Sequence, residues 1–229
     1  MDIQCLKNNK IEPEDFVNDH NIKFELPTFV CGFSKEPFLM LTGNYKPEKY
    51  LYTDKIPTEV KTIRVPVPEH IETGVICYFK DTTKIDLHIP KGLYPVNIMK
   101  RALLANVIKT LGLQKENVIF KSNDLLVNVD GKLRKFCGFF HCELNGWDYY
   151  ALPVSFKIDY NLAREVYRLD TKKMIKKGVI NDISDVMIGL EEIGINSKET
   201  FINSFIENIS KRFNWKVINN DFLLIEKND

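Results

Sequence analysis

The residues best suited to chemistry lie between Phe120 and Cys142, where the chain reads FKSNDLLVNVDGKLRKFCGFFHC. Lys135 lies in an alternating stretch, three residues before Gly138. An ammonium held on a rigid strand can stabilise negative charge on a carbonyl or phosphate oxygen. A nearby glycine lets a ligand approach because it has no Cβ. Lysine is also common on exposed hairpin edges, where it prevents association between strands, so both interpretations stay open from the residues alone.

Cys137, His141 and Cys142 form a second group of reactive side chains in this stretch. Thiols and imidazoles bind zinc, and a thiol beside a histidine can act as a nucleophile. Strand alternation, however, points His141 away from Cys142 and sends Cys137 and Cys142 to opposite faces. We therefore interpret the cysteines as buried structural thiols. The sequence also contains no P-loop, G-x-S-x-G or H-E-x-x-H motif, so hydrolase and zinc-enzyme classes have no motif support.

The charge distribution limits the kinds of partner. The chain has 32 basic and 31 acidic residues and a net charge of +1, so no global field attracts it to nucleic acid or to a membrane. A local exception is DTKKMIKKGV, which contains four lysines between residues 172 and 177. Cations are favoured at the C-terminal end of a helix, which explains this run; a phosphate-binding role is the alternative.

Length and thiol content describe a globular chain. With 229 residues, 44% of them hydrophobic, it can bury a full core as one domain. Five cysteines without framework spacing favour reduced thiols, so we expect a cytoplasmic protein. The N-terminal residues are polar and no apolar run reaches membrane-spanning length, so we expect no membrane association.

The elements that position Lys135 are predicted to be strands. Residues 73–79 and 84–90 are expected to form a hairpin, and Asp130-Gly131 and Asn145-Gly146 are strong hairpin turns. The other predicted strands are 37–43, 61–67, 118–121, 124–129, 132–140, 148–158 and 215–226.

Helices are predicted on either side of these strands. One runs from Pro95 to about Leu111, a second follows a cap at Asp159 or Asn161, and two more cover 184–193 and 198–213. The first helix has an apolar stripe at Ile98, Ala102, Ala105, Val107, Ile108 and Leu111. The pattern predicts an α+β fold: a single domain with a mainly antiparallel sheet flanked by helices. Residues 1–36 are a poorly patterned N-terminal segment, and 37–229 are expected to form the domain.

The order of these pieces resembles the lipoate-protein ligase and octanoyltransferase family, whose fold is the biotin/lipoate ligase-like fold. An Asn-Asp-Leu strand leads to a Lys-x-x-Gly strand, an acyl-binding strand and a Lys-Gly loop. The positions that match this pattern or its nucleotide-binding segments are Gly43, Asn44, Arg64, Gly74, Asn123, Asp124, Lys135, Gly138, Lys177 and Gly178.

The resemblance implies a function for these positions. Lys135 corresponds to the catalytic lysine, and the remaining matched residues correspond to ligand-binding positions. The ligands implied are ATP or AMP with Mg²⁺ and a lipoate- or octanoate-like acyl group, and the partner implied is an acyl-acceptor protein. The expected activity is that of a divergent acyl transferase or ligase that uses an acyl-adenylate or acyl-carrier donor.

The sequence also departs from the family pattern. Only Gly74 stands where the family has a run of glycines, and Glu69 and Glu72 add negative charge there. A catalytically inactive ligase-like domain that binds a small ligand or a protein partner is therefore the alternative. A purely structural or interaction protein is a third, and nucleic acid is the least favoured partner because no nucleic-acid-binding module is recognisable.

Overall fold

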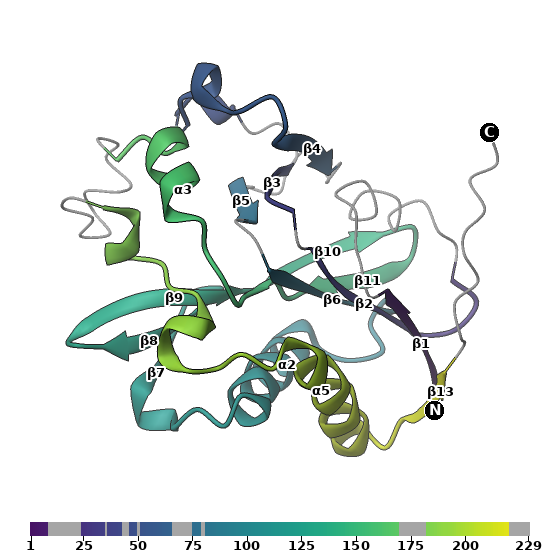
Figure 1. Ribbon diagram of the computed structural model, residues 1–229. Coiled ribbons are helices and arrows are strands. Elements are labelled where there is room, and N and C mark those ends of the chain that lie inside the picture. Colours follow the sequence, from purple (N-terminus) through teal and green to yellow (C-terminus); the bar gives the residue numbers. More distant parts are fainter. Residues whose placement is uncertain are drawn as a thin grey trace.

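A large β-sheet crosses the molecule and separates a lower layer of two helices from an upper part that contains a small sheet and a short helix (Figure 1). The computed structural model describes residues 1–8, 24–34, 36–42, 46–49, 51–65, 75–78, 81–169 and 182–219. Over these ranges, no helix is long and apolar enough to cross a membrane.

The large sheet has ten strands within the described residues, in the order β13-β1-β2-β6-β12-β9-β8-β7, while β11 pairs with β6 and β10 pairs with β11. β1 pairs in parallel with β2 and β13, and the other pairs are antiparallel. The strands are β1 (Asp2–Asn8), β2 (Thr28–Ser34), β6 (Thr82–Pro90), β7 (Val118–Lys121), β8 (Asp124–Val129), β9 (Lys132–Gly138), β10 (Phe140–Leu144), β11 (Trp147–Ala151), β12 (Val154–Ser155) and β13 (Lys216–Asn219). The predicted α+β class with a mainly antiparallel sheet is confirmed.

Two hairpins form where their turn residues predict them. Asp130 and Gly131 join β8 to β9 with φ of 52° and 77°, and Asn145 and Gly146 join β10 to β11 with φ of 51° and 81°. Two consecutive left-handed residues give the turn whose twist matches that of the flanking strands. Ser122, in the turn between β7 and β8, also has a positive φ of 57° although it carries a side chain.

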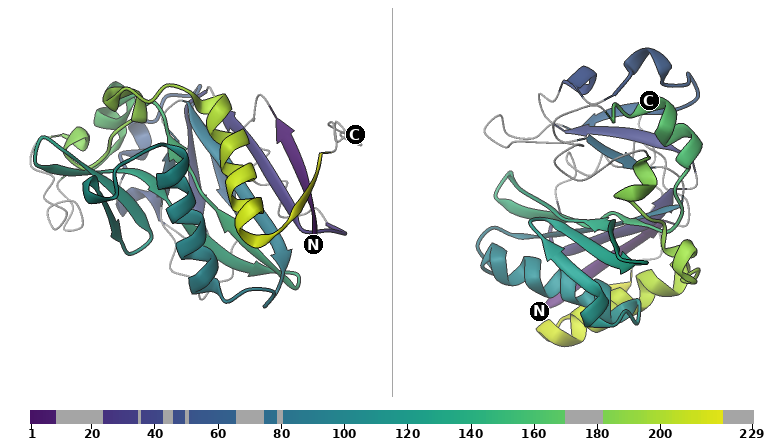
Figure 2. Two further views of the ribbon diagram at one scale, coloured as in Figure 1. Left: turned by 90° about the horizontal axis from the view of Figure 1, so that it is seen from below. Right: turned by 90° about the vertical axis from the view of Figure 1, so that its left-hand side faces the viewer.

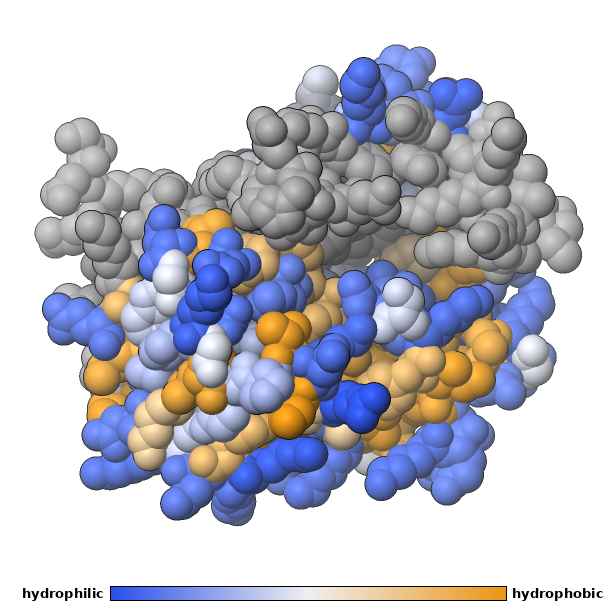
Figure 3. All heavy atoms as spheres, turned by 180° about the vertical axis from the view of Figure 1, so that it is seen from behind, coloured by the Kyte–Doolittle hydropathy of each residue, from blue (hydrophilic) through white to orange (hydrophobic). Residues whose placement is uncertain are grey.

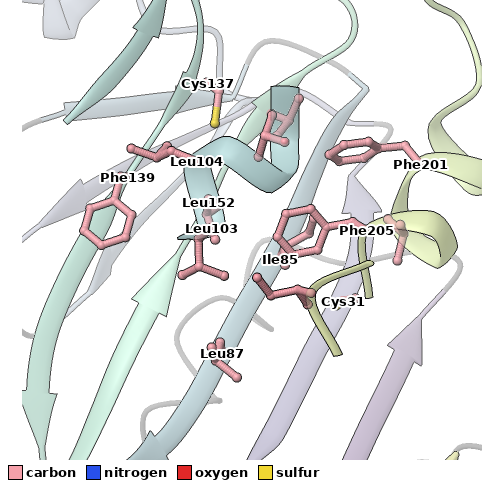
Figure 4. Close-up of a cluster of buried hydrophobic side chains, with 14 of the residues drawn as sticks. Cys31, Ile85, Leu87, Leu103, Leu104, Cys137, Phe139, Leu152, Phe201 and Phe205 are labelled. Carbon is pink, nitrogen blue, oxygen red and sulfur yellow. The ribbon is translucent and has the colours of Figure 1, made fainter. Parts of the chain in front are cut away.

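Helices α2 (Val96–Thr110) and α5 (Lys198–Phe213) lie side by side below the large sheet (Figures 1 and 2). The amide of Asn106 on α2 donates to the carbonyl of Phe205 on α5 at 2.8 Å. Between the helices and the sheet lies the main core, in which apolar side chains from both layers meet (Figure 4). Residues of this core labelled in the figure include Ile85, Leu87, Leu103, Leu104, Cys137, Leu152, Phe201 and Phe205.

The buried arc of α2 is shifted from the predicted stripe. Ala102, Val107 and Ile108 are buried as expected, but Ile98 is 54% exposed and Ala105 is only half-buried. Met99, Leu103 and Leu104 complete the buried side. The difference arises because α2 is covered by the sheet and by α5 together, and this pair of neighbours selects an arc that the hydrophobic pattern alone leaves ambiguous.

The upper part rests on the other face of the large sheet. Its small sheet has the order β4-β3-β5, formed by β4 (Lys61–Val65), β3 (Phe38–Thr42) and β5 (Val75–Tyr78). Helix α3 (Tyr160–Val166) packs beside it, capped by the Asp159 carboxylate, which accepts hydrogen bonds from the backbone N–H groups of Asn161 and Leu162. A second, smaller core joins these elements and contains Leu39, Leu51, Val60, Ile158, Leu162, Ala163, Val166 and Ile183.

Two of the predicted elements are wrong. Residues 73–79 and 84–90 do not form a hairpin, because β5 pairs with β3 in the small sheet while β6 lies in the large sheet. Residues 184–193 form no continuous helix; two short 3₁₀ turns, η5 (Ile183–Asp185) and η6 (Leu190–Ile193), flank an extended segment. The other short turns are η2 (Pro47–Lys49), η3 (Thr53–Lys55) and η4 (Lys115–Asn117).

The poorly patterned first 36 residues contribute β1 and β2 to the large sheet. Neither strand was predicted: β2 is buried over almost its whole length and lacks an alternation of polar and apolar residues, and β1 alternates only over Asp2–Cys5, which is too short a signal. The parallel pairing of β1 with β13 brings the first residues of the chain beside residues 216–219.

Candidate functional site

Lys135 lies on β9, as predicted, beside an irregularity in the sheet. Asp124 pairs with Gly138, Leu125 with Cys137 and Leu126 with Lys135, so Phe136 is an extra residue on β9. Such a bulge re-aims the side chains that follow it. Here it allows Phe136 and Cys137 both to enter the main core, while Lys135 and Gly138 keep to the opposite face.

The Lys135 ammonium is paired with an aspartate from the neighbouring strand. Its Nζ lies 2.7 Å from Oδ1 of Asp124, and the two side chains are 35% and 30% exposed. A Cβ at Gly138 would lie 3.5 Å from this Nζ and 3.5 Å from Cγ of Pro153. An ammonium has three donors, so the pairing with Asp124 leaves donors for an incoming ligand.

The backbone of β9 around Lys135 is fixed along the edge that faces away from β8. Its N–H donates to the carbonyl of Val186 at 2.7 Å, and its carbonyl accepts from the N–H of Ile188 at 3.0 Å. Further along the same edge of β9, the N–H of Gly138 donates to the carbonyl of Pro153 at 3.1 Å. The expected neighbourhood of Asp124, Lys135, Gly138 and the segment around Pro153 is therefore present, but the predicted strand 148–158 is divided at Leu152 and Pro153 into β11 and β12.

The segment that pairs with Lys135 is itself held by close contacts. Gly189 packs against the backbone of Phe156 and Lys157, just after β12, so tightly that a Cβ there would lie 2.7 Å from the carbonyl oxygen of Phe156. The hydroxyl of Tyr160 lies 2.6 Å from a carboxylate oxygen of Glu192 and 3.1 Å from the carbonyl of Met187. The pKa of Tyr160 is raised well above its usual value, mainly by burial of the hydroxyl and to a smaller extent by its hydrogen bond to Glu192.

The remaining predicted residues have different environments. The side-chain oxygen of Asn123 accepts from the ammonium of Lys100 on α2, and its carbonyl accepts from the N–H of Phe139 at 2.7 Å. Arg64 lies on β4, where its backbone pairs with that of Leu41. The predicted ligand-binding residues Gly43, Asn44, Gly74, Lys177 and Gly178 lie outside the described residues.

A buried ion pair on β6 was missed by the sequence reading. Nζ of Lys84 lies 3.1 Å from Oδ2 of Asp86, with the side chains only 1% and 2% exposed, and the Tyr149 hydroxyl donates to the same carboxylate at 2.8 Å. Thr83 pairs with the core-facing Val154, so Lys84 and Asp86 point to the face that carries Lys135. The signal was present in KIDLHI, where polar and apolar residues alternate.

The thiols occupy the two faces that strand alternation predicts. Cys137 is in the main core, whereas Cys142 packs with Tyr149 and Ala151, and both are buried. Burial raises the pKa of Cys142 to about 12 and that of Cys137 further. Protonated, enclosed thiols are poor nucleophiles. Among the described residues, no three His, Cys, Asp or Glu side chains are grouped in a way that could hold a metal ion.

Comparison with solved structures identifies the fold. A bi-partite lipoate protein ligase from Thermoplasma acidophilum is similar with a TM-score of 0.70 and 12% identity, over 97% of this chain and 87% of that chain. A lipoate-protein ligase A bound with ATP has a TM-score of 0.68 and 10% identity, over 98% of this chain and 90% of that chain. LipL1 of P. falciparum in complex with lipoate has a TM-score of 0.63 and 15% identity, over 95% of this chain and 65% of that chain. No protein-family model and no curated protein sequence matches the chain.

The chain therefore has the lipoate/biotin ligase-like fold. The predicted resemblance to lipoate-protein ligases is confirmed at the level of the fold, at sequence identities of 10–15%.

Proposed function

We propose that this protein is an acyl transferase or ligase that acts on a lipoyl- or octanoyl-like group, with Lys135 stabilising the group during transfer. The observation that carries the proposal is the arrangement of Lys135, Asp124 and Gly138 on one face of the lipoate/biotin ligase-like fold. A partly exposed ammonium that packs beside a glycine, which carries no Cβ, can receive a carbonyl or phosphate oxygen.

The proposed role of Lys135 follows from charge. When an acceptor attacks an acyl adenylate, negative charge grows on the acyl carbonyl oxygen and the leaving phosphate, and a preplaced ammonium stabilises both. Asp124 holds the ammonium at 2.7 Å, and the backbone bonds to Val186 and Ile188 fix the strand below it. Gly138 leaves the space beside Nζ that a Cβ would occupy.

In this proposal, nucleotide and magnesium bind beside Lys135, where Asp124 supplies one carboxylate. Mg²⁺ is commonly bound by one or two carboxylates together with substrate phosphates, and the Asp124 side chain is 30% exposed. We propose that ATP or AMP binds beside Lys135 and that Asp124 holds Mg²⁺, which would neutralise phosphate charge. The solved structures with this fold include one bound with ATP and one in complex with lipoate.

The second substrate in this proposal is an acyl-acceptor protein. Ile119, Leu126 and Lys135 form one cross-strand row, and Ile119 and Leu133 are 42% and 38% exposed on the same face. Exposed apolar side chains beside the proposed site are suited to contact with a protein. Hydrophobic patches bordered by hydrophilic residues are also visible on the face seen from behind (Figure 3).

A catalytically inactive ligand-binding domain is the second candidate. The observation that favours it is the replacement of the glycine run by VPVPEHIETG, residues 65–74, which has bulky and acidic residues where the family has small ones. Backbone N–H groups in glycine-rich loops are the usual donors to phosphate. Binding without turnover distinguishes this candidate from the enzyme.

The test measures binding and transfer separately. Calorimetry with octanoyl sulfamoyl-adenosine, a stable analogue of the acyl adenylate, should show binding by the natural protein, and Lys135→Ala should weaken it by about 100-fold. Arginine should not restore binding, because its wide planar group does not fit the space of an ammonium. Transfer from octanoyl-AMP to a lipoyl-domain acceptor should also be lost in Lys135→Ala.

Two further variants serve as controls. Gly138→Ala should keep the fold, because its Cβ makes only ordinary contacts at 3.5 Å, yet it should weaken binding by filling the space beside Nζ. Lys132 also lies on β9, where its side chain pairs with Asp185. Lys132→Ala should leave binding unchanged. If the natural protein shows no binding, the proposal is wrong.

A further inference from the structure

Lys100 on α2 makes a set of contacts that the proposed function does not use. Its ammonium donates to the carbonyl of Ser122 at 2.6 Å and to the side-chain oxygen of Asn123, and it lies 5.5 Å from the centre of the Phe139 ring. The side chain is half-buried. A lysine on a solvated helix face does not normally hold two oxygen atoms of the same turn.

The turn that accepts these hydrogen bonds from Lys100 has a backbone conformation that needs stabilising contacts. Ser122 has a φ of 57°, in the left-handed region that side chains rarely adopt, and both Ser122 and Asn123 are exposed. From the other side, the Phe139 N–H donates to the Asn123 carbonyl at 2.7 Å. The turn is thus fastened to α2 by Lys100 and to the strand end after Gly138 by Phe139.

The residue that follows this turn is Asp124. It is the first residue of β8, and its carboxylate holds the ammonium of Lys135 at 2.7 Å. A small displacement at the end of a strand moves the carboxylate that the strand presents. The path from Lys100 through the turn to Asp124 and Lys135 consists of direct contacts or adjacent residues throughout.

We infer that Lys100 is a positioning residue: it fixes the Ser122–Asn123 turn, so that the Asp124 carboxylate holds the Lys135 ammonium in one orientation. The consequence for ligand binding rests on the proposed function, whereas the effect on Lys135 itself does not. This assigns Asn123 a role as the acceptor through which α2 controls the site.

The first test observes Lys135 directly. In protein labelled with ¹⁵N-lysine, the Nζ resonance of Lys135 is assigned by its absence in Lys135→Ala. Lys100→Met should broaden or shift this resonance, because it keeps the length of the side chain and removes the charge and the donors. Lys100→Arg should restore it, since a guanidinium can bridge the same two oxygens. Arg101→Met, an exposed neighbour on the same helix, is the matched control and should leave it unchanged.

The second test measures binding of octanoyl sulfamoyl-adenosine by calorimetry. Lys100→Met should weaken binding by about tenfold, and Lys100→Arg should recover most of it. Asn123→Ala removes the acceptor while Lys100 stays in place. It should change the Lys135 resonance as Lys100→Met does, and it replaces Lys100→Met in the test if that variant folds poorly.

The outcomes separate the two proposals. An unchanged Lys135 resonance in folded Lys100→Met and Asn123→Ala overturns the positioning role. A changed resonance in a protein whose natural form does not bind the probe supports the positioning role and rejects the proposed function. An equal effect of Arg101→Met would reduce Lys100 to a general contributor of charge and would also overturn the inference.

Discussion

At the scale of single residues, two of the lysine–aspartate pairs in the described part of the chain differ in their physical role. The pair of Lys135 and Asp124 is about one-third exposed, so water screens the attraction and the pair contributes little stability. The pair of Lys84 and Asp86 is almost fully buried, so each charge depends on its neighbours. Exposure therefore identifies the first pair as available for a ligand and the second as structural.

The same exchange at both lysines should show this difference. Lys135→Met should change the free energy of unfolding by less than about 1 kcal/mol. Lys84→Met should cost about 3 kcal/mol or more, because it leaves the Asp86 carboxylate buried without its cation. Urea unfolding of both variants measures the two changes, and equal effects would contradict the assignment.

At the scale of elements, the site depends on segments that pair with β9 from outside its hairpin. Residues 186–188 bind the backbone of Lys135, and Gly189 permits this segment to lie against the carbonyl of Phe156. Helix α2 contributes Lys100 from the opposite side of the sheet. The position of the ammonium is thus set by β9, by residues 186–189 and by α2, which are distant from one another in sequence.

Gly189→Ala tests the close approach. Its φ is −83°, so alanine suits the backbone, but the added Cβ would lie 2.7 Å from the Phe156 carbonyl oxygen and must displace backbone. We expect a loss of about 1–3 kcal/mol in the free energy of unfolding. Gly138→Ala, whose Cβ meets atoms at 3.5 Å, is the matched control and should lose much less. Similar stabilities of the two variants would refute the close packing of this segment.

At the scale of the whole molecule, buried thiols link stability to pH. Burial raises the pKa of Cys5 from 9.0 to about 11 and that of Cys142 to about 12, and it raises those of Cys31 and Cys137 as well. Above pH 9 the unfolded chain loses these protons while the folded chain keeps them. The stability is therefore fully present below pH 9 and falls as the pH rises toward 11 or 12.

Cys142→Ala isolates one thiol from the other groups that titrate in this range. Between pH 8 and pH 10 the variant should lose about 1 kcal/mol less stability than the natural protein, since one raised pKa is removed. Urea unfolding in the presence of a reductant at both pH values gives the comparison. Parallel losses in the two proteins would show that Cys142 is not enclosed when folded.

The sequence by itself determined the local structure around the site. Alternating residues placed Lys135 on a strand, Asp130-Gly131 and Asn145-Gly146 formed the expected turns, and Asp159 capped the expected helix. Each of these features depends on residues a few positions apart, so its energetic cause is contained in the local pattern. The α+β class followed from the order of such elements.

Only the tertiary structure decided which elements meet. It placed β5 and β6 in different sheets, paired β1 with β13, inserted a bulge at Phe136 and brought Lys100 and residues 186–188 to Lys135. These contacts join residues separated by up to about two hundred positions, and they form because burial of the whole core outweighs local preference. A pattern of neighbouring residues therefore predicts which side chain could act, while long-range packing determines what holds it in place.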